Sequence, residues 1–90
     1  MSFTETNIEE DEITEVIDKK QLILYNDDIN SFQWVIECLM DILGFTLNQA
    51  EQSALLAHER GKIAIKSGDY DTLKPYHEEF GKCGITTAIE

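Results

Sequence analysis

One stretch of this chain, residues 22–34, organises the rest of the fold: Leu22-Ile23-Leu24-Tyr25-Asn26-Asp27-Asp28-Ile29-Asn30-Ser31-Phe32-Gln33-Trp34. It opens with a run of large apolar residues, which has the length and composition of a buried strand. Three short polar residues, 26–28, then favour a turn, because their side chains can hydrogen-bond to nearby backbone groups. Asn30 or Ser31 can cap a helix that begins directly afterwards. The sequence therefore predicts a polar site where a strand ends in carboxylates beside a helix N-terminus.

Length, charge and cysteine content narrow the class of protein. The 90 residues suffice for one small domain, and 18 acidic against 7 basic residues give a formal charge of -11. This excess of acid argues against binding to nucleic acid or to an anionic membrane, since both need basic groups. No apolar run reaches the roughly 20 residues of a membrane span, and no signal-peptide pattern is present. Cys38 and Cys83 are isolated, so we expect free thiols in a reducing cytoplasm. We also expect the protein to be a monomer.

The first 18 residues differ in composition from the rest. They carry seven acidic residues and no basic one, which leaves 11 acidic and 7 basic residues for 19–90. Because like charges repel and apolar residues are few there, we expect residues 1–18 to be a flexible acidic extension of a domain spanning 19–90. The extension either keeps the chain soluble or acts as a functional tether.

Two helices are predicted after the turn. Apolar residues at helical spacing indicate the first over residues 31–43, with Gly44 as its C-terminal stop. The second extends over 48–60, with Thr46 as its N-cap and Gly61 as its end. Small residues form a stripe along this second helix and permit the close approach of a neighbouring element or a ligand: Ala50, Ala54, Ala57 and Gly61.

The remaining residues predict two strands around a third helix. Residues 62–67 alternate with period two and residues 85–89 are rich in β-branched types, so both are predicted to be strands. Between them we expect a short helix to about residue 80, capped by Asp69 or Asp71, with Pro75 unfavourably inside it. The predicted fold is α+β, in the order strand-helix-helix-strand-helix-strand, with a three-stranded antiparallel sheet and helices packed on one face.

Three polar features are candidates for a functional site. The first joins residues 26–28 with His58: these are either turn formers beside a partly buried helix residue, or oxygen and imidazole acceptors that converge on a cation such as an ammonium group. The second is a calcium loop with ligands at EF-hand spacing: Asn26, Asp28, Asn30 and Glu37. A strand precedes this loop where an EF-hand has a helix, and Ser31 replaces the required glycine, so the calcium interpretation is weak.

A third candidate is a metal site made of cysteine and histidine: Cys38, His58, His77 and Cys83. No pair among them has the close spacing typical of such sites, so we expect no metal. The chain also lacks a nucleophile elbow, a P-loop and a glycine-rich phosphate loop. We therefore expect no catalytic residues, no cofactor and no enzymatic activity.

Two motifs together make the chain resemble the Clp protease adaptor family, ClpS. These are Asn-Asp-Asp at 26–28 and the His-x-x-Gly-Lys spacing of His58, Gly61 and Lys62. The resemblance covers about residues 22–67 and continues weakly to residue 90. It implies a small α+β domain that binds the N-terminal residue of N-degron substrates and hands them to a Clp-type AAA+ unfoldase.

The resemblance implies that Asn26, Asp27 and His58 grip the free α-amino group of the substrate. A protonated amine offers three donors, and an amide oxygen, a carboxylate and a neutral imidazole nitrogen can accept them. This is terminal-amine capture, a binding function rather than a catalytic one.

The resemblance also implies a hydrophobic pocket for the first side chain of the substrate, lined by Asn30, Phe32, Ala54, Leu55 and Ala57. The family commonly has Thr where Asn30 stands, Met where Phe32 stands, and larger apolar residues where Ala54 and Ala57 stand. Phe32 thus adds bulk at the gate, while the two alanines remove it from the wall. We expect a reshaped pocket that still favours large first residues: Leu, Phe, Tyr or Trp.

Two further features bear on delivery to the unfoldase. Asp71 falls near an acidic position that the family uses to contact the N-terminal domain of its AAA+ partner. The extension 1–18 corresponds to the flexible N-terminal segment that the family uses in delivery, which favours the tether over the solubilising tail. The alternative function is a protein-interaction module of the same fold without amine recognition.

Overall fold

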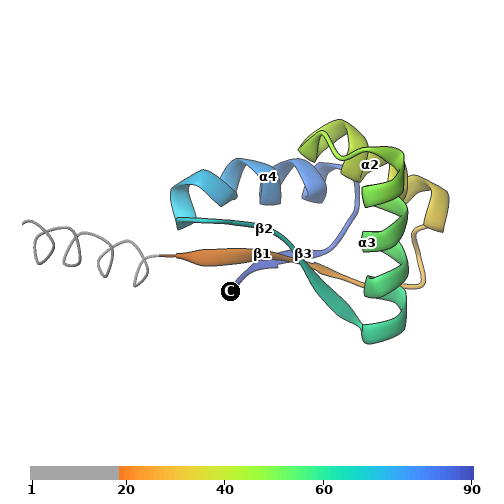
Figure 1. The fold of residues 1–90 in the computed structure, drawn as a ribbon. Helices are drawn as coiled ribbons and strands as arrows, with labels where there is room; N and C mark the ends of the chain where they lie inside the picture. The colour runs from red at the N-terminus through yellow and green to blue at the C-terminus, as the bar shows by residue number, and fades with distance from the viewer. Residues whose placement is uncertain (1–18) are drawn as a thin grey trace, which may run out of the picture.

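The computed structural model describes residues 19–90, which form a three-stranded sheet covered by three helices (Figure 1). The elements in chain order are β1 (Lys20–Tyr25), α2 (Phe32–Leu43), α3 (Leu47–Arg60), β2 (Lys62–Gly68), α4 (Tyr70–Lys82) and β3 (Thr87–Ile89). The predicted α+β class and the predicted order of elements are confirmed. The predicted acidic extension, residues 1–18, lies outside the described residues.

β1 is the central strand of the sheet. The strand order is β2-β1-β3, and both neighbours run antiparallel to β1, so that Leu24 pairs with Ile63 on one side and with Thr87 on the other. Three consecutive residues of this strand are buried, with Leu22, Ile23 and Leu24 only 0%, 7% and 1% exposed. Leu22 and Leu24 belong to the core, whereas Ile23, which follows a register shift in the pairing with β2, is buried outside that cluster. The strand is therefore a continuous apolar run rather than an alternating one.

The helices pack on one face of the sheet, with α4 above the strands and α3 toward one end (Figure 1). They enclose a core to which β1, β2, all three helices and the segment before β3 contribute: Leu22, Leu24, Ile36, Cys38, Leu39, Ala50, Ala54, Ala57, Ile65, Leu73, Phe80 and Ile85. Burying one Leu or Phe side chain completely contributes about 1.5–3 kcal/mol. The three alanines of α3 are all buried, so the small-residue stripe faces the core, as close packing requires.

Side-chain caps fix where α2 and α3 begin. The Ser31 hydroxyl accepts a hydrogen bond from the Trp34 amide over 3.1 Å, so Ser31 is the N-cap of α2 and the Asn30 side chain is free for other contacts. At α3, Thr46 Oγ1 accepts from the Gln49 amide over 3.1 Å, and Gln49 Oε1 accepts from the Thr46 amide over 2.9 Å. This reciprocal pair satisfies two backbone donors that the helix itself leaves unpaired.

α4 runs past its proline and extends to Lys82, slightly further than predicted. Pro75 has no N–H to donate to the carbonyl of Asp71, one turn earlier. Both residues are exposed, so water can satisfy that carbonyl. Leu73 and Phe80 are fully buried on either side of the proline, and their packing holds the helix together across it.

The last strand is shorter than the predicted 85–89 and comprises only Thr87–Ile89. Ile85 is 3% exposed and belongs to the core instead of the sheet. The buried Thr87 hydroxyl lies 2.7 Å from Nδ1 of His77 in α4, so this polar group is paired. Within the described residues, every helix is too short or too polar to cross a lipid bilayer.

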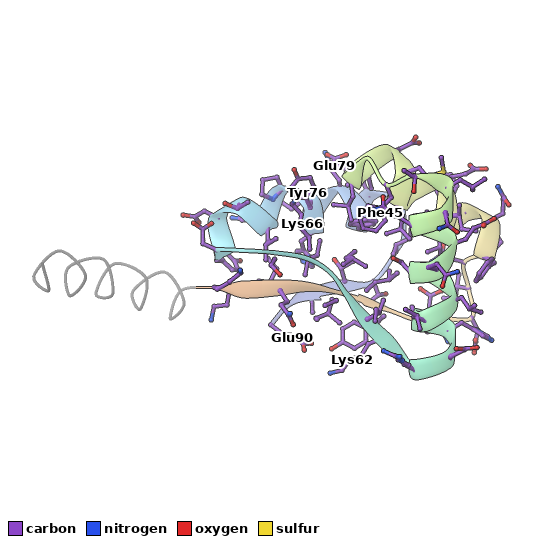
Figure 2. The ribbon with its side chains drawn as sticks, in the orientation of Figure 1. Phe45, Lys62, Lys66, Tyr76, Glu79 and Glu90 are labelled. Atoms are coloured by element: carbon purple, nitrogen blue, oxygen red, sulfur yellow. The ribbon has the colours of Figure 1, made fainter. Side chains whose placement is uncertain are left out.

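Lysines of β2 lie over aromatic rings of both neighbouring elements (Figure 2). Lys66 Nζ is 5.1 Å from the ring centroid of Tyr76 in α4, and Lys62 Nζ is 5.6 Å from that of Tyr25 in β1. Lys62 Nζ also lies 3.6 Å from Oε1 of Glu90, and the Tyr25 hydroxyl donates to Oε2 of the same carboxylate. This hydrogen bond to Glu90 raises the pKa of Tyr25. The contacts hold the outer end of the Tyr25 side chain.

Candidate functional site

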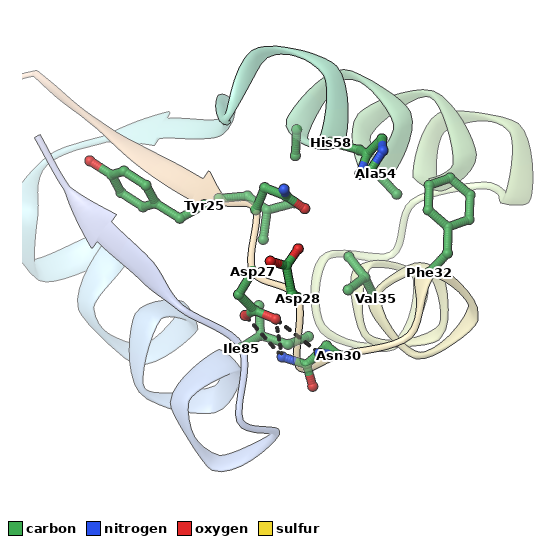
Figure 3. A pocket seen from close by; sticks show the side chains of 12 residues that line it. Tyr25, Asp27, Asp28, Asn30, Phe32, Val35, Ala54, His58 and Ile85 are labelled. Carbon is green, nitrogen blue, oxygen red and sulfur yellow. Dashed lines mark hydrogen bonds between the residues drawn. The ribbon is translucent and has the colours of Figure 1, made fainter.

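A pocket of about 300 Å³ opens where the loop after β1, the helices α2 and α3 and the segment before β3 meet (Figure 3). One part of its lining is polar, with two carboxylates, two side-chain amides and an imidazole, and the rest is largely apolar. The lining residues are Leu24, Tyr25, Asn26, Asp27, Asp28, Asn30, Phe32, Val35, Ala54, Ala57, His58 and Ile85. The two motifs that sequence analysis singled out, residues 26–28 and His58, therefore lie on the same cavity.

A backbone hydrogen bond brings these two motifs together. The chain leaves the sheet after Tyr25, and the amide of Asn26 donates to the carbonyl oxygen of Gly61 over 2.9 Å. Gly61 ends α3 with a φ of +90°, a backbone conformation that L side chains rarely adopt. His58 lies in the last turn of the same helix. The polar turn is thus fastened to the end of α3, one helical turn from the imidazole.

The carboxylate of Asp27 is directed at its own loop. Asp27 Oδ1 accepts hydrogen bonds from the backbone amides of Ile29 over 3.1 Å and Asn30 over 2.9 Å. The side-chain amide of Asn30 donates to Oδ1 over 3.2 Å and to Oδ2 over 3.0 Å. Asp27 therefore fixes the conformation of the loop, and hydrogen bonds from several donors stabilise the negative charge of its carboxylate.

The carboxylate of Asp28 points into the pocket, toward the side that His58 occupies (Figure 3). The residue is exposed, and no protein donor to its side chain is present among the hydrogen bonds of residues 19–90. The cluster of residues 26–28 with His58 that the sequence offered as a cation site includes Asp28, but the amine-binding set implied by the family resemblance does not. The two aspartates are adjacent in a loop outside any strand, and their identity gives no sign of which carboxylate bonds to the loop and which points into the pocket.

The apolar part of the pocket combines a wall of small residues with an aromatic rim. Ala54 and Ala57 are buried on α3, whereas Phe32 at the start of α2 is 47% exposed. Sequence reasoning missed three apolar lining residues, Leu24, Val35 and Ile85, because nothing in their local sequence distinguishes a pocket wall from ordinary core.

Leu55 does not line the pocket, contrary to expectation, and is 41% exposed. Ala54, Ala57 and His58 share one face of α3 through the spacing of three and four residues, whereas Leu55, two residues before Ala57, lies on nearly the opposite side of the helix from Ala57. Asp71, the expected unfoldase contact, is an exposed residue in the first turn of α4 and also lies outside the pocket lining.

The charge of the pocket suits a cationic group. Asp27 and Asp28 both line it, and its lining includes no lysine or arginine. Two carboxylates without a basic neighbour favour a ligand that carries positive charge. Residues 19–90 hold no group of three or more His, Cys, Asp or Glu side chains that is placed to bind a metal ion. An organic cation with hydrogen-bond donors fits this chemistry.

Comparison with known proteins identifies the family. A family model described as ATP-dependent Clp protease adaptor protein ClpS matches residues 17–83. The chain belongs to the ClpS family. ClpS proteins are adaptors of Clp protease systems with AAA+ ATPases, and they are not enzymes. This chain is therefore a ClpS-type Clp protease adaptor.

Individual relatives agree with this assignment. The chain is 32% identical over 69 residues to the ATP-dependent Clp protease adapter protein ClpS of Thermosynechococcus vestitus. The aligned residues make up 76% of this chain and 73% of that protein. The ClpS of a Nostoc species is also 32% identical over 69 residues, covering 76% and 71%. Among solved structures, Agrobacterium tumefaciens ClpS2 bound to L-phenylalaninamide matches the fold with a TM-score of 0.70 at 16% identity, over 81% of this chain and 95% of that one.

Proposed function

We propose that this ClpS-type adaptor binds the N-terminal residue of N-degron substrates in the pocket described above. The polar part of the pocket takes the free α-amino group, and the apolar part takes the first side chain. The adaptor then delivers the substrate to a Clp AAA+ unfoldase. The observation that carries the proposal is the joining, in one pocket, of an acidic acceptor cluster with an apolar wall.

The acceptor cluster matches the donors of a protonated amine. An α-ammonium has three N–H donors, and the residues assigned to it supply an amide oxygen (Asn26), carboxylates (Asp27 and Asp28) and an imidazole nitrogen (His58). We add Asp28 to the set implied by the family resemblance because its carboxylate points into the pocket (Figure 3). A nearby carboxylate also offsets the cost of removing the ammonium from water.

The apolar wall and the volume of the pocket support a large first side chain. A cavity of roughly 150 Å³ is enough to hold benzene, and this pocket of about 300 Å³ leaves room for an aromatic ring and the amine. We therefore assign Leu, Phe, Tyr and Trp as the preferred first residues. The solved structure of Agrobacterium tumefaciens ClpS2 contains L-phenylalaninamide, which has an aromatic side chain and a free α-amine.

Delivery is assigned to surfaces outside the pocket. Asp71 is exposed at the start of α4, where it is accessible to the N-terminal domain of the ATPase. We assign the acidic residues 1–18 as a tether used in delivery, and we place the adaptor in the cytoplasm, where unpaired Cys38 and Cys83 remain reduced.

Fluorescence anisotropy tests the proposal directly. A labelled peptide that begins with Phe is titrated with the protein, and the same peptide acetylated at its N-terminus is titrated in parallel. We expect Kd values in the micromolar range or tighter for the free amine and no measurable binding for the acetylated peptide. A Leu peptide and an Asp peptide with otherwise identical sequences show whether the first side chain matters.

Two outcomes contradict the proposal. Equal affinity for the free and acetylated peptides removes the amine from the recognition. No binding by any of the large apolar N-termini means that the altered pocket has lost this function, and the chain is then an interaction module built on the same fold.

A further inference from the structure

The side chain of Asn30 joins two parts of the chain that are far apart in sequence. Its amide nitrogen donates to the Asp27 carboxylate oxygens over 3.0 and 3.2 Å, and to the carbonyl oxygen of Gly84 over 2.9 Å. An amide –NH₂ has two hydrogens, and here one can serve the carboxylate while the other serves the carbonyl. Because both partners are acceptors only, the nitrogen end of the Asn30 side chain must face them.

A second side chain of the same region reaches the same turn. Trp34, four residues after Asn30 and in the first turn of α2, donates through Nε1 to the carbonyl oxygen of Cys83 over 2.9 Å. The carbonyls of two consecutive residues, Cys83 and Gly84, are therefore both bound from the start of α2. The next residue, Ile85, is buried and lines the pocket.

The two contacts of Asn30 connect the polar and apolar parts of the pocket. Asp27 belongs to the acceptor cluster, and Gly84 precedes the wall residue Ile85. Gly84 has a φ of +80°, so the turn that Asn30 holds is one that a residue with a side chain rarely adopts. A residue with one donor, such as Thr or Ser, cannot bind both acceptors at once.

We infer that Asn30 is a positioning residue, which fixes Asp27 and the turn at Gly84 relative to each other before a substrate arrives. This inference rests on the proposed amine-binding function and assigns a role that goes beyond lining the pocket. Fixing the acceptors in advance reduces the ordering cost that binding would otherwise incur. The Ser31 cap makes this possible, because Asn30 is not needed to begin α2.

The test compares three variants for binding of the Phe peptide with its free amine. Asn30→Leu has a similar size and no donor, Asn30→Thr keeps one donor, and Trp34→Phe removes the bond to Cys83 but leaves Asp27 untouched. We expect a loss of affinity of about tenfold or more for Asn30→Leu and a smaller loss for Asn30→Thr. We expect Trp34→Phe to lose no more than about threefold. Circular dichroism and thermal melts confirm that each variant is folded at the temperature of the titration.

NMR of the free protein provides a readout that a purely structural role would not change. In the wild type, the side-chain amide protons of Asn30 should exchange slowly with water, and in Asn30→Leu the ¹⁵N relaxation of Asp27 and Gly84 should show increased motion. In Trp34→Phe, the ¹⁵N relaxation of Asp27 should be the same as in the wild type. Rapid exchange of the Asn30 amide protons, or unchanged motion at Asp27 and Gly84, overturns the inference.

Failure of the inference is distinguishable from failure of the proposed function. If the wild type binds the Phe peptide through its amine and folded Asn30→Leu binds it equally well, only the positioning role is wrong. If the wild type binds no peptide through its amine, the proposed function is wrong and the positioning role falls with it.

Discussion

The amide nitrogen of Asn26 and the carbonyl oxygen of Gly61 lie 2.9 Å apart, in a hydrogen bond between residues that are 35 positions apart in the chain. This single backbone contact joins the end of β1 to the end of α3. It places the two aspartates that follow Asn26 beside His58. Because only backbone atoms take part, substitution of side chains in the pocket can test the chemistry of the site without removing the bond that assembles it.

Asp28→Asn tests the charge of the acceptor cluster. The substitution keeps the shape of the side chain that points into the pocket and removes its charge. We expect amine-dependent binding of a Phe peptide to weaken by on the order of 2 kcal/mol, because a buried ammonium loses a charged acceptor. Anisotropy titration measures the change. Asp27→Ala should weaken binding to a similar degree, because it removes both an acceptor of the amine and the hydrogen bonds that order the loop. An Asp28→Asn affinity within twofold of wild type excludes Asp28 from the site.

Ala57→Leu tests the wall of the pocket. Ala57 is 3% exposed and lines the cavity, so added methyl groups must occupy space that the substrate side chain would fill. We expect affinity to fall more for peptides that begin with Trp or Phe than for one that begins with Leu. Overpacking lowers the free energy of unfolding by about 1–3 kcal/mol. Thermal melts must therefore show that the variant is folded at the temperature of the titration. The control is Leu55→Ala, because Leu55 lies outside the pocket lining. If this variant changes the order of affinities among the Trp, Phe and Leu peptides, the assignment of Ala57 to the pocket wall is contradicted.

Thr46→Ala tests the cap of α3, the helix that carries both the wall and His58. The substitution removes one half of the reciprocal pair with Gln49. We expect the free energy of unfolding to fall by about 1 kcal/mol, measured by urea denaturation. Thr46→Ser keeps a hydroxyl and should retain most of the stability. Equal destabilisation by Ser and Ala would show that the hydroxyl contributes nothing.

Asp69→Asn tests the pH dependence of stability at the start of α4. Hydrogen bonds from the side chain and backbone of Thr72 lower the pKa of the Asp69 carboxyl. A carboxyl whose folded-state pKa lies below its unfolded value stabilises the fold above the unfolded pKa, and this contribution disappears as the pH falls through the folded pKa. Asn also caps helices but does not titrate. We therefore expect thermal melts from pH 7 to pH 3 to decline less steeply for Asp69→Asn than for the wild type, and parallel declines contradict this.

Cys38 should be far less reactive than Cys83. Cys38 lies in the core and is 3% exposed. Its burial is the main reason that the pKa of its thiol is raised to about 12, and its contact with Cys83 is the second. The thiolate is the reactive species, so a protonated, buried thiol reacts slowly. With a chromogenic disulfide reagent at pH 8, we expect one equivalent to react quickly and the second only on unfolding. Cys83→Ser should abolish the fast phase, and a fast phase that survives in this variant contradicts the prediction.

Local chemistry in the sequence was sufficient to predict most of the secondary structure. Thr46, Gly44 and Gly61 mark helix ends through side-chain and backbone geometry that acts within a few residues, and the helices begin or end there. The apolar run from Leu22 to Tyr25 lies in strand β1, which begins two residues earlier, at Lys20. Pro75 is the exception, because a locally unfavourable residue is tolerated when buried neighbours on the same helix supply the packing.

The sequence by itself also determined which residues are candidates for the site, since Asn26, Asp27 and His58 were recognisable by residue type and spacing. Only the tertiary structure decided how each is used. Whether Asp27 or Asp28 faces the pocket depends on the path of the chain after β1 and on the donors of Asn30. Side-chain direction and contacts between distant residues arise from the packing of whole elements, which residue type and local spacing do not encode.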